Sequence, residues 1–412
     1  MRILMFTSSY PKFPGDGTAP FIERIARGVA ACGHSVDLVL PHHPDLIVAG
    51  RSDGLPLRLF PYYAGPPKHY VWGYATSMQA DRQLKLGAIL VAPVAFLSGI
   101  LKLRRLLKAV RYDLVHAHWV LPNGPIAALA ARGSRLPLVI SLHGSDIFMA
   151  ERRGALRAIA TWVFRQSGLV TACSRDLAER ARLVGRLDST PVVLPYGVDV
   201  EELVGGDSSV WRARAGASAA EFLVIGLGRL VPKKGFDDLI RAAAILRDEG
   251  SRVRVALGGT GDLAGVLAAK VREHGCEDLV RLLGKIPHDQ VGAFLRAADV
   301  VVVPSVRDEH GNVDGLPNVL LEGLAAGRPV VATRIAGIPD VVEHGANGLL
   351  VPPGNPQALA EALRLLMRDP QLRLRLAEEG QRSARAMSWE AYSGRLIAGY
   401  EGVLHQRSGS AH

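Results

Sequence analysis

Short β-rich runs alternate with helical patterns along all 412 residues, and this alternation restricts the fold more than any other feature of the sequence. Such alternation is typical of parallel sheets wrapped by helices. The strands predicted in the first half are Arg2–Thr7, Ser35–Leu40, Asp113–His116, Leu138–Leu142, Leu169–Ala172 and Val192–Leu194. The helices predicted between them are Ala19–Cys32, Leu84–Val110, Gly124–Arg132, Glu151–Arg165 and Arg175–Val184.

The second half of the chain repeats the pattern. Its predicted strands are Phe222–Leu227, Val253–Leu257, Val280–Leu283, Val300–Val303, Val330–Ala332 and Leu349–Val351. Its predicted helices are Phe236–Asp248, Asp262–His274, Asp289–Ala298, Asn318–Ala326 and Pro356–Met367. Between the halves, GGDSSVWRARAGASAA has the composition of a linker or of the entry to a domain.

A chain of this length is too long for one core, so we expect two domains, residues 1–200 and 201–387. A final helix over residues 388–406 either packs back on the first domain or ends the second; the pattern alone favours neither. Two open α/β sheets predict a cleft between the domains, with ligands at the carboxyl ends of the strands.

Composition narrows the class of protein. A hydrophobic content of 48% indicates packed layers and excludes a disordered chain. Three widely spaced cysteines and an N-terminus without secretory features fit the cytoplasm. The formal charge of +10 comes mostly from scattered Arg, without zinc-type spacing or aromatic-interleaved basic motifs. We therefore expect a phosphate-bearing substrate near a membrane, and no nucleic acid.

One segment invites a membrane interpretation. Leu86–Leu101 is apolar for sixteen residues and is followed by Lys102, Arg104, Arg105 and Lys108. It is shorter than the roughly 20 residues that span a bilayer. We predict a helix that is either buried in the first domain or lies on an anionic membrane surface.

The strongest functional signal is DGLPNVLLEGLAAGRPVVAT, in which Asp314 and Glu322 stand eight residues apart. Pro317 suits the first position of a helix, whose free N–H groups around Leu316, Asn318 and Val319 favour an anion such as a diphosphate. Carboxylates beside that site can accept sugar hydroxyls. We assign Asp314 to the transferred sugar, together with Gly315, and Glu322 to the ribose.

This stretch resembles the acidic-x7-acidic signature of glycosyltransferase family 4, and the resemblance covers nearly the whole chain. It implies an α/β fold of the GT-B type, two Rossmann-like domains with parallel sheets facing a central cleft, and a retaining, metal-independent hexosyltransferase. Two positions depart from the family pattern. Asp314 replaces the usual Glu, and Pro317 replaces a common Gly and so removes one amide donor.

The turn GRLVPKKG between a strand and a helix carries three cationic side chains. Cations there suit a diphosphate leaving group. The resemblance implies Arg229 and Lys234 as the diphosphate pair, and we expect Lys233 to be solvated. It also implies that the nucleobase lies near Lys285 and Ile286, after a later strand.

In the first domain the resemblance implies that His143, in SLHGSD, contacts the transferred sugar. Asp146 in the same motif either takes part or caps the following helix. The glycine-bearing loop Tyr10–Thr18 is expected beside the diphosphate, through Gly17, and the acceptor, through Gly15.

His116 and His118 have the spacing of metal ligands, but no third ligand is evident nearby. We expect His118 on the acceptor side and no metal.

The sequence therefore predicts transfer of a sugar from a nucleoside diphosphate to a hydroxyl acceptor, with no further cofactor. The expected acceptor is a glycan of the cell envelope or a lipid-linked glycan, and the expected location is the cytoplasm, peripherally at the inner membrane face. Two alternatives remain: a nucleotide-sugar epimerase on the same fold, and a non-catalytic sugar-nucleotide-binding protein. A nicotinamide dehydrogenase is disfavoured, because no GxGxxG follows the first strand.

Overall fold

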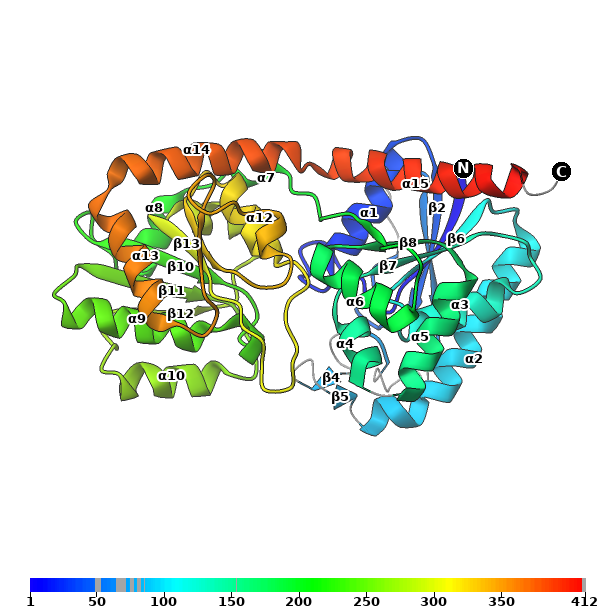
Figure 1. The fold of residues 1–412 in the computed structure, drawn as a ribbon, viewed down its shortest axis with the longest axis horizontal. Helices are drawn as coiled ribbons and strands as arrows, with labels where there is room; N and C mark the ends of the chain where they lie inside the picture. Colours follow the sequence, from blue (N-terminus) through cyan, green and yellow to red (C-terminus); the bar gives the residue numbers. More distant parts are fainter. Residues whose placement is uncertain are drawn as a thin grey trace. The chain divides into compact units, whose positions relative to one another are not determined.

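The computed structural model of the chain describes residues 1–48, 53–63, 72–74, 78–79, 83–84, 86–152 and 154–409 (Figure 1). It divides into two compact units. Unit 1 comprises Met1–Tyr196 with Trp389–His412, and unit 2 comprises Gly197–Ser388. Each unit is a parallel sheet flanked by helices, as the alternation of strand and helix patterns predicts.

Unit 1 contains a seven-stranded sheet in the order β3-β2-β1-β6-β7-β8-β9, and all its pairings are parallel. Its strands are β1 (Arg2–Phe6), β2 (Ser35–Pro41), β3 (Leu57–Tyr62), β6 (Leu114–His118), β7 (Leu138–Leu142), β8 (Ser167–Ala172) and β9 (Val192–Val193). A separate antiparallel pair is formed by β4 (Met78–Gln79) and β5 (Gln83–Leu84). The sequence-based prediction missed β3, the edge strand.

The helices of unit 1 are α1 (Pro20–Ala31), α2 (Leu86–Ala109), α3 (Asn123–Ala131), α4 (Ser145–Arg152), α5 (Gly154–Gln166), α6 (Arg175–Gly185) and α15 (Trp389–Gly409). The prediction for residues 151–165 was wrong at its start, because a separate helix, α4, occupies Ser145–Arg152. Helices α2, α3 and α5 lie next to one another (Figure 1).

Helix α15 belongs to unit 1, where it lies beside α1 (Figure 1). Tyr392, Leu396 and Tyr400 are buried in the same core cluster as residues of β1 and β2. The Tyr400 hydroxyl lies 2.7 Å from His116 Nδ1. At Gly28 the two helices approach so closely that a Cβ would lie 2.1 Å from Ser393 Oγ. The last helix is thus an integral layer of unit 1.

Unit 2 contains a six-stranded sheet in the order β12-β11-β10-β13-β14-β15, again with parallel pairing. Its strands are β10 (Phe222–Leu227), β11 (Val253–Gly258), β12 (Val280–Gly284), β13 (Val300–Val303), β14 (Val330–Thr333) and β15 (Leu349–Val351). Its α-helices are α7 (Val200–Leu203), α8 (Ser208–Arg214), α9 (Phe236–Asp248), α10 (Ala264–Glu273), α11 (Val291–Arg296), α12 (Asn318–Ala325), α13 (Pro356–Arg368) and α14 (Pro370–Ala386). Short 3₁₀ turns are η2 (Pro232–Lys234), η3 (His288–Gln290) and η4 (Ile338–Asp340).

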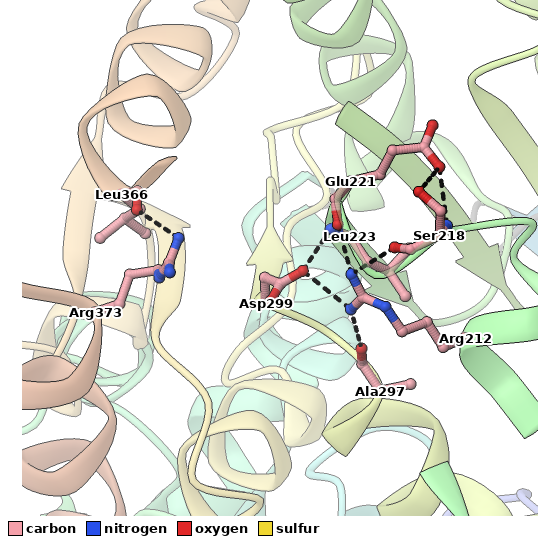
Figure 2. A network of polar contacts seen from close by, with 8 residues as sticks. All are labelled: Arg212, Ser218, Glu221, Leu223, Ala297, Asp299, Leu366 and Arg373. Atoms are coloured by element: carbon pink, nitrogen blue, oxygen red, sulfur yellow. Dashed lines mark hydrogen bonds and ion pairs between the residues drawn. The ribbon is translucent and has the colours of Figure 1, made fainter. Parts of the chain in front are cut away.

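Of the two interpretations of residues 205–220, a linker or the entry to a domain, the structure supports the entry, because helix α8 is anchored within unit 2. Trp211 of α8 is buried against Phe294. The Arg212 guanidinium donates to the carbonyls of Ala297, Ser218 and Glu221 and to the Asp299 carboxylate (Figure 2). The sequence around Trp211 and Arg212 is rich in Gly, Ala and Ser, so its composition did not indicate that these two side chains anchor a helix.

The Arg212 contacts give a prediction about stability. Arg212→Ala leaves the acceptors around α8 without their charged donor, so we expect the free energy of unfolding of unit 2 to fall by about 2–3 kcal/mol. Arg241→Ala is the matched control: Arg241 is half exposed and pairs with Asp237 one helical turn away, and such surface pairs contribute under about 1 kcal/mol. Urea unfolding of both variants measures the difference. Equal losses would refute the anchoring role of Arg212.

Candidate functional site

Asp314 joins two segments of unit 2 that are far apart in the chain. One carboxylate oxygen lies 3.0 Å from Lys233 Nζ, and the other lies 2.7 Å from Lys234 Nζ. The lysines belong to η2, after β10, whereas Asp314 precedes α12, after β13. Because β10 and β13 are neighbours in the parallel sheet, their carboxyl ends meet at one edge.

The three side chains form a tight, largely buried cluster of charges. Each is only 13–15% exposed. Burial by itself would raise the pKa of Asp314, but the charges of Lys233 and Lys234 outweigh burial and hold its pKa well below the usual range. Our expectation that Lys233 is solvated was wrong, because Asp314 draws its ammonium group inwards.

Glycine makes the lysine turn possible at one position above all. Gly235 has φ +66°, and a Cβ there would lie 1.9 Å from the carbonyl oxygen of Pro304. The backbone N–H of Val306 donates to the carbonyl of Lys233 over 2.9 Å. The turn is therefore pressed against the segment that follows β13, which fixes the direction of both lysines.

Arg229, from the same turn, has an exposed side chain. Partial loss of hydration next to neighbouring segments lowers its pKa, and the charges of Asp314 and Asp262 oppose that effect. A guanidinium stays protonated throughout the physiological range, so Arg229 is a third fixed cation near Asp314.

Sequence reasoning overlooked the turn GGTGD after β11. A Cβ at Gly259 would lie 1.8 Å from the Gly228 carbonyl oxygen, and one at Gly261 would lie 2.5 Å from that of Leu230. The Leu230 N–H also donates to the carbonyl of Thr260 over 2.9 Å. The glycines thus let the turns after β10 and β11 lie backbone to backbone, and their clustering directly after a strand was the available signal.

Helix α12 begins at Asn318, and Pro317 occupies the N-cap rather than the first helical position that we expected. The side chains of Leu316 and Val319 are buried. These two residues therefore offer a ligand only their backbone N–H groups. The Gly315 carbonyl accepts from Gly337 N–H over 3.0 Å, which ties the loop before α12 to the turn after β14.

Glu322 is the second acid of the motif and behaves differently from Asp314. It lies one turn into α12, and burial raises its pKa to about 7, with Lys234 acting in the opposite direction. One acid of the motif is therefore held ionised and the other is poised near neutrality.

Lys285 and Ile286, predicted near the nucleobase, follow β12. Lys285 is exposed, whereas Ile286 is buried and packs on Gly258, where a Cβ would lie 2.7 Å from its Cγ1. The Gly259 N–H donates to the Gly284 carbonyl over 2.7 Å. The turn after β12 is thus joined to the turn after β11.

In unit 1, His143 lies at the end of β7 in an aromatic cluster. Its Nδ1 is 2.8 Å from the Tyr196 hydroxyl, and its Nε2 is 3.2 Å from His118 Nδ1. Phe21 and Trp119 contact its ring. Burial, with a smaller effect of His118, holds its pKa well below the usual range. His143 is therefore neutral and can offer a hydrogen bond but not a charge.

The two other histidines that the sequence singled out, His116 and His118, are fully buried. His116 bonds the Ser141 hydroxyl over 2.8 Å as well as Tyr400, so both of its ring nitrogens are engaged within unit 1. Burial lowers the pKa of His118 to about 3. Within the described ranges, no group of three or more His, Cys, Asp or Glu side chains could hold a metal ion.

Asp146 organises the neighbouring loop instead of facing a ligand. It lies within the first turn of α4 and accepts from Val120 N–H over 2.8 Å and from Gly144 N–H over 3.1 Å. Burial raises its pKa to about 6 against the effect of these bonds. Asp146 thus lies inside α4 and not at the N-cap position that one of our two interpretations gave it, and it ties the start of the helix to the segment after β6.

The loop containing Gly15 and Gly17 is organised by Asp16, which accepts from Lys12 N–H and Thr18 N–H. Gly15 has φ +81°, and both glycines border open space. The loop thus leaves room for a ligand at both positions.

Two parallel-sheet α/β units of this kind define the GT-B fold. The fold matches that of Anabaena Alr3699/HepE, solved in complex with UDP-glucose, with a TM-score of 0.73, 24% identity, and coverage of 98% of this chain and 100% of that one.

Comparison of the sequence identifies the family. Residues 16–197 match the glycosyl transferase 4-like domain, and residues 207–383 match glycosyl transferases group 1. The D-inositol 3-phosphate glycosyltransferase of Nocardiopsis dassonvillei is 32% identical over 332 residues, 76% of each chain. The putative teichuronic acid biosynthesis glycosyltransferase TuaC of Bacillus subtilis is 28% identical over 383 residues, 88% of each. The chain belongs to the group 1, or family 4, glycosyltransferases, and it is an enzyme of sugar transfer.

The raised pKa of Glu322 predicts a pH-dependent stability. In the folded protein the Glu322 carboxyl keeps its proton up to about pH 7. In the unfolded chain the same carboxyl loses its proton near the ordinary pKa of 4.5. Between these values the unfolded state binds fewer protons, so this group makes the free energy of unfolding fall as pH rises. Glu322→Gln removes this pH-dependent loss of stability, because the glutamine side chain does not titrate.

We expect the free energy of unfolding of the variant to match that of wild type below pH 4.5 and to exceed it by on the order of 3 kcal/mol at pH 8. Urea unfolding across this range measures the difference, with Glu378→Gln, an exposed change on α14, as the control. A constant offset between Glu322→Gln and wild type would contradict the prediction.

Proposed function

We propose that this glycosyltransferase moves a sugar from a nucleoside-diphosphate donor to a hydroxyl acceptor, with retention of the anomeric configuration. The observation that carries the proposal is the gathering of Arg229, Lys233 and Lys234 around Asp314, just before the start of α12. These cations outnumber the carboxylate and leave a net positive charge. An anionic diphosphate suits such a site. The fold neighbour from Anabaena, which was solved with UDP-glucose, supports this class of donor.

In the ligand-free protein Asp314 neutralises much of the lysine charge. Arrival of a diphosphate gives the ammonium groups stronger acceptors, and its phosphate oxygens can also take N–H groups at the start of α12, near Leu316, Asn318 and Val319. Asp314 then keeps one oxygen for a sugar hydroxyl, beside Gly315. In the free protein, the ion pairs with Asp314 hold the ammonium groups of Lys233 and Lys234 in place.

The transfer step follows from this charge distribution. The bond between the anomeric carbon and the diphosphate oxygen breaks, and its electron pair goes to the diphosphate. Arg229 and Lys234 stabilise the growing negative charge. The acceptor oxygen bonds to the anomeric carbon on the same face, and its proton passes to an oxygen of the leaving diphosphate. No carboxylate is required as a base, and no metal ion enters the proposed step.

Glu322 is proposed to accept hydroxyls of the ribose, and the turn at Lys285 and Ile286 to border the base. With a pKa near 7, Glu322 binds either as an acceptor or as a donor. Hydrogen bonds to a ribose diol stabilise its ionised form, so donor binding is expected to lower this pKa.

We keep His143 as the residue of unit 1 that hydrogen-bonds the transferred sugar. Its neutrality suits such a contact, and Tyr196 and His118 set its orientation. In the same unit, the loop at Gly17 is proposed to border the diphosphate and that at Gly15 the acceptor. His118 is proposed to act on the acceptor side through its hold on His143.

The acceptor is proposed to be a glycan of the cell envelope or a lipid-linked glycan. The names of two relatives, one linked to teichuronic acid biosynthesis and one to inositol 3-phosphate, support a hydroxyl-rich or phosphorylated acceptor. We propose a cytoplasmic location, which is supported by three cysteines that are not joined in disulfides, Cys32, Cys173 and Cys276. Fractionation of cells tests it, and recovery outside the cytoplasmic and inner-membrane fractions would contradict it.

A panel of sugar nucleotides tests the function. The true donor at a hundredfold over its dissociation constant should stabilise the protein by about 2.7 kcal/mol. With that donor and extracted acceptors, NMR of the new linkage is expected to show the anomeric configuration of the donor, and inversion would refute retention.

The rate of transfer is expected to stay the same after divalent ions are chelated, and loss of activity with the chelator would refute metal independence. A free sugar epimer formed without acceptor would indicate the epimerase.

Substitutions in the two units should separate binding from transfer. Arg229→Ala and Lys234→Ala each remove a charged hydrogen bond, so donor binding should weaken about tenfold to a hundredfold. Lys270→Ala, which breaks a surface pair with Asp237, is the control. His143→Ala should lower the transfer rate and leave binding of the free nucleoside diphosphate unchanged. Calorimetric titration and initial rates measure both effects; unchanged binding in Arg229→Ala and Lys234→Ala would refute the site.

A further inference from the structure

Helix α2 carries a stripe of exposed aliphatic side chains. Leu86, Leu90, Val94, Leu97 and Leu101 are between 44% and 73% exposed. Their spacings of four, four, three and four residues place them on one face of a helix. Isolated exposed leucines are common on proteins, but a continuous apolar face four turns long marks an interaction surface.

The opposite face of α2 is committed to the core of unit 1. Ala88, Ala95, Gly99 and Leu103 are buried. The contact is close, since a Cβ at Gly99 would lie 3.1 Å from Ile126 Cγ2 of α3. The exposed stripe is therefore the outer side of a packed helix and faces away from α3.

Helix α2 is long and apolar enough to cross a membrane, and it is the one helix within the described residues that meets these two criteria. Its packing argues against a span. A spanning helix would have to leave α3 and the sheet. In addition, the stretch of α2 without charged residues ends at Leu101, short of the roughly 20 residues required. A helix that stays docked can use only its outer face.

The charges at the end of α2 indicate what covers that face. Arg104, Arg105, Lys108 and Arg111 are exposed, and no acidic residue occurs between Leu86 and Tyr112. Lys108 continues the line of the apolar stripe by helical spacing, whereas the Arg104 guanidinium turns back and donates to the Leu129 carbonyl of α3 over 3.1 Å. An aliphatic stripe followed by cations complements a bilayer surface, where acyl chains lie beneath anionic headgroups.

From this geometry we infer that the outer face of α2 docks unit 1 on an anionic lipid bilayer. The aliphatic side chains from Leu86 to Leu101 enter the headgroup boundary while Arg105 and Lys108 contact the headgroups. The helix lies in the interface and stays packed on α3. This docking holds the enzyme at a lipid surface, where lipid-linked acceptors are concentrated. It does not depend on the proposed donor chemistry, because membrane binding is measured without donor.

Vesicle flotation tests the inference with the full chain. Wild type should float with vesicles of phosphatidylcholine containing about a third phosphatidylglycerol at low salt, and less at high salt, where headgroup charges are screened. The Leu90→Glu/Leu97→Glu variant should bind about tenfold more weakly or worse, since it places two charges in the apolar stripe. Arg105→Glu/Lys108→Glu should lose roughly thirtyfold or more, because each cation near an anionic surface contributes about 1 kcal/mol.

A matched control is Leu183→Glu/Leu374→Glu, which changes two leucines of α6 and α14 that are 54% and 62% exposed. It should float as wild type does. All variants change exposed side chains, so unchanged thermal unfolding verifies that each is folded. Three results would overturn the inference: no flotation of wild type, equal binding by Leu90→Glu/Leu97→Glu, or a wild-type dimer in solution that this variant dissociates while lipid binding is absent. The last would assign the face to a second copy of the chain.

Discussion

The arrangement of the candidate site in unit 2 depends on the ion pairs of Asp314 with Lys233 and Lys234. They connect the carboxyl ends of β10 and β13, strands that are neighbours in the sheet but about eighty residues apart in the chain. Gly235 allows the lysine turn to touch Pro304, which brings the charged groups within reach of one another. Buried charges are tolerated only when they are paired, so the loop before α12 and the turn after β10 have to fold together.

The two acids of one short motif are held in opposite states. Asp314 remains ionised because two ammonium groups outweigh the cost of burial. Glu322 lies one turn into α12, where burial outweighs the single charge of Lys234 and raises the pKa of Glu322 to about 7. Separate environments give one carboxylate a fixed charge and give the other a proton that a ligand can displace. The same principle keeps His143 neutral in unit 1, where burial opposes protonation.

Sequence reasoning failed where apolar patterning is weak. Strand β3 contains Pro61 and an exposed Arg58, features that disguise an edge strand. Helix α14 buries only Leu376, Gly380 and Ala384 among charged residues, so its periodicity is faint. Helix α8 is held by Trp211 and Arg212 through contacts with α11 and the segments around β10 and β13 that its composition does not reveal. In contrast, strands such as β10 and helices such as α9 match their predicted bounds, because dense apolar residues specify both period and length.

The sequence by itself determined the alternation of strands and helices and which charged residues stand at the ends of strands, because both depend on local periodicity and residue order. The family and the GT-B fold were implied by the resemblance to the family 4 signature, and the family models and the fold neighbour confirm them. Only the tertiary structure decided that Lys233 shares Asp314, that Glu322 titrates near neutrality, that α15 is a layer of unit 1, and that α2 buries one face while exposing the other. Each of these depends on distances and burial between segments remote in the chain, and local patterning carries no measure of either.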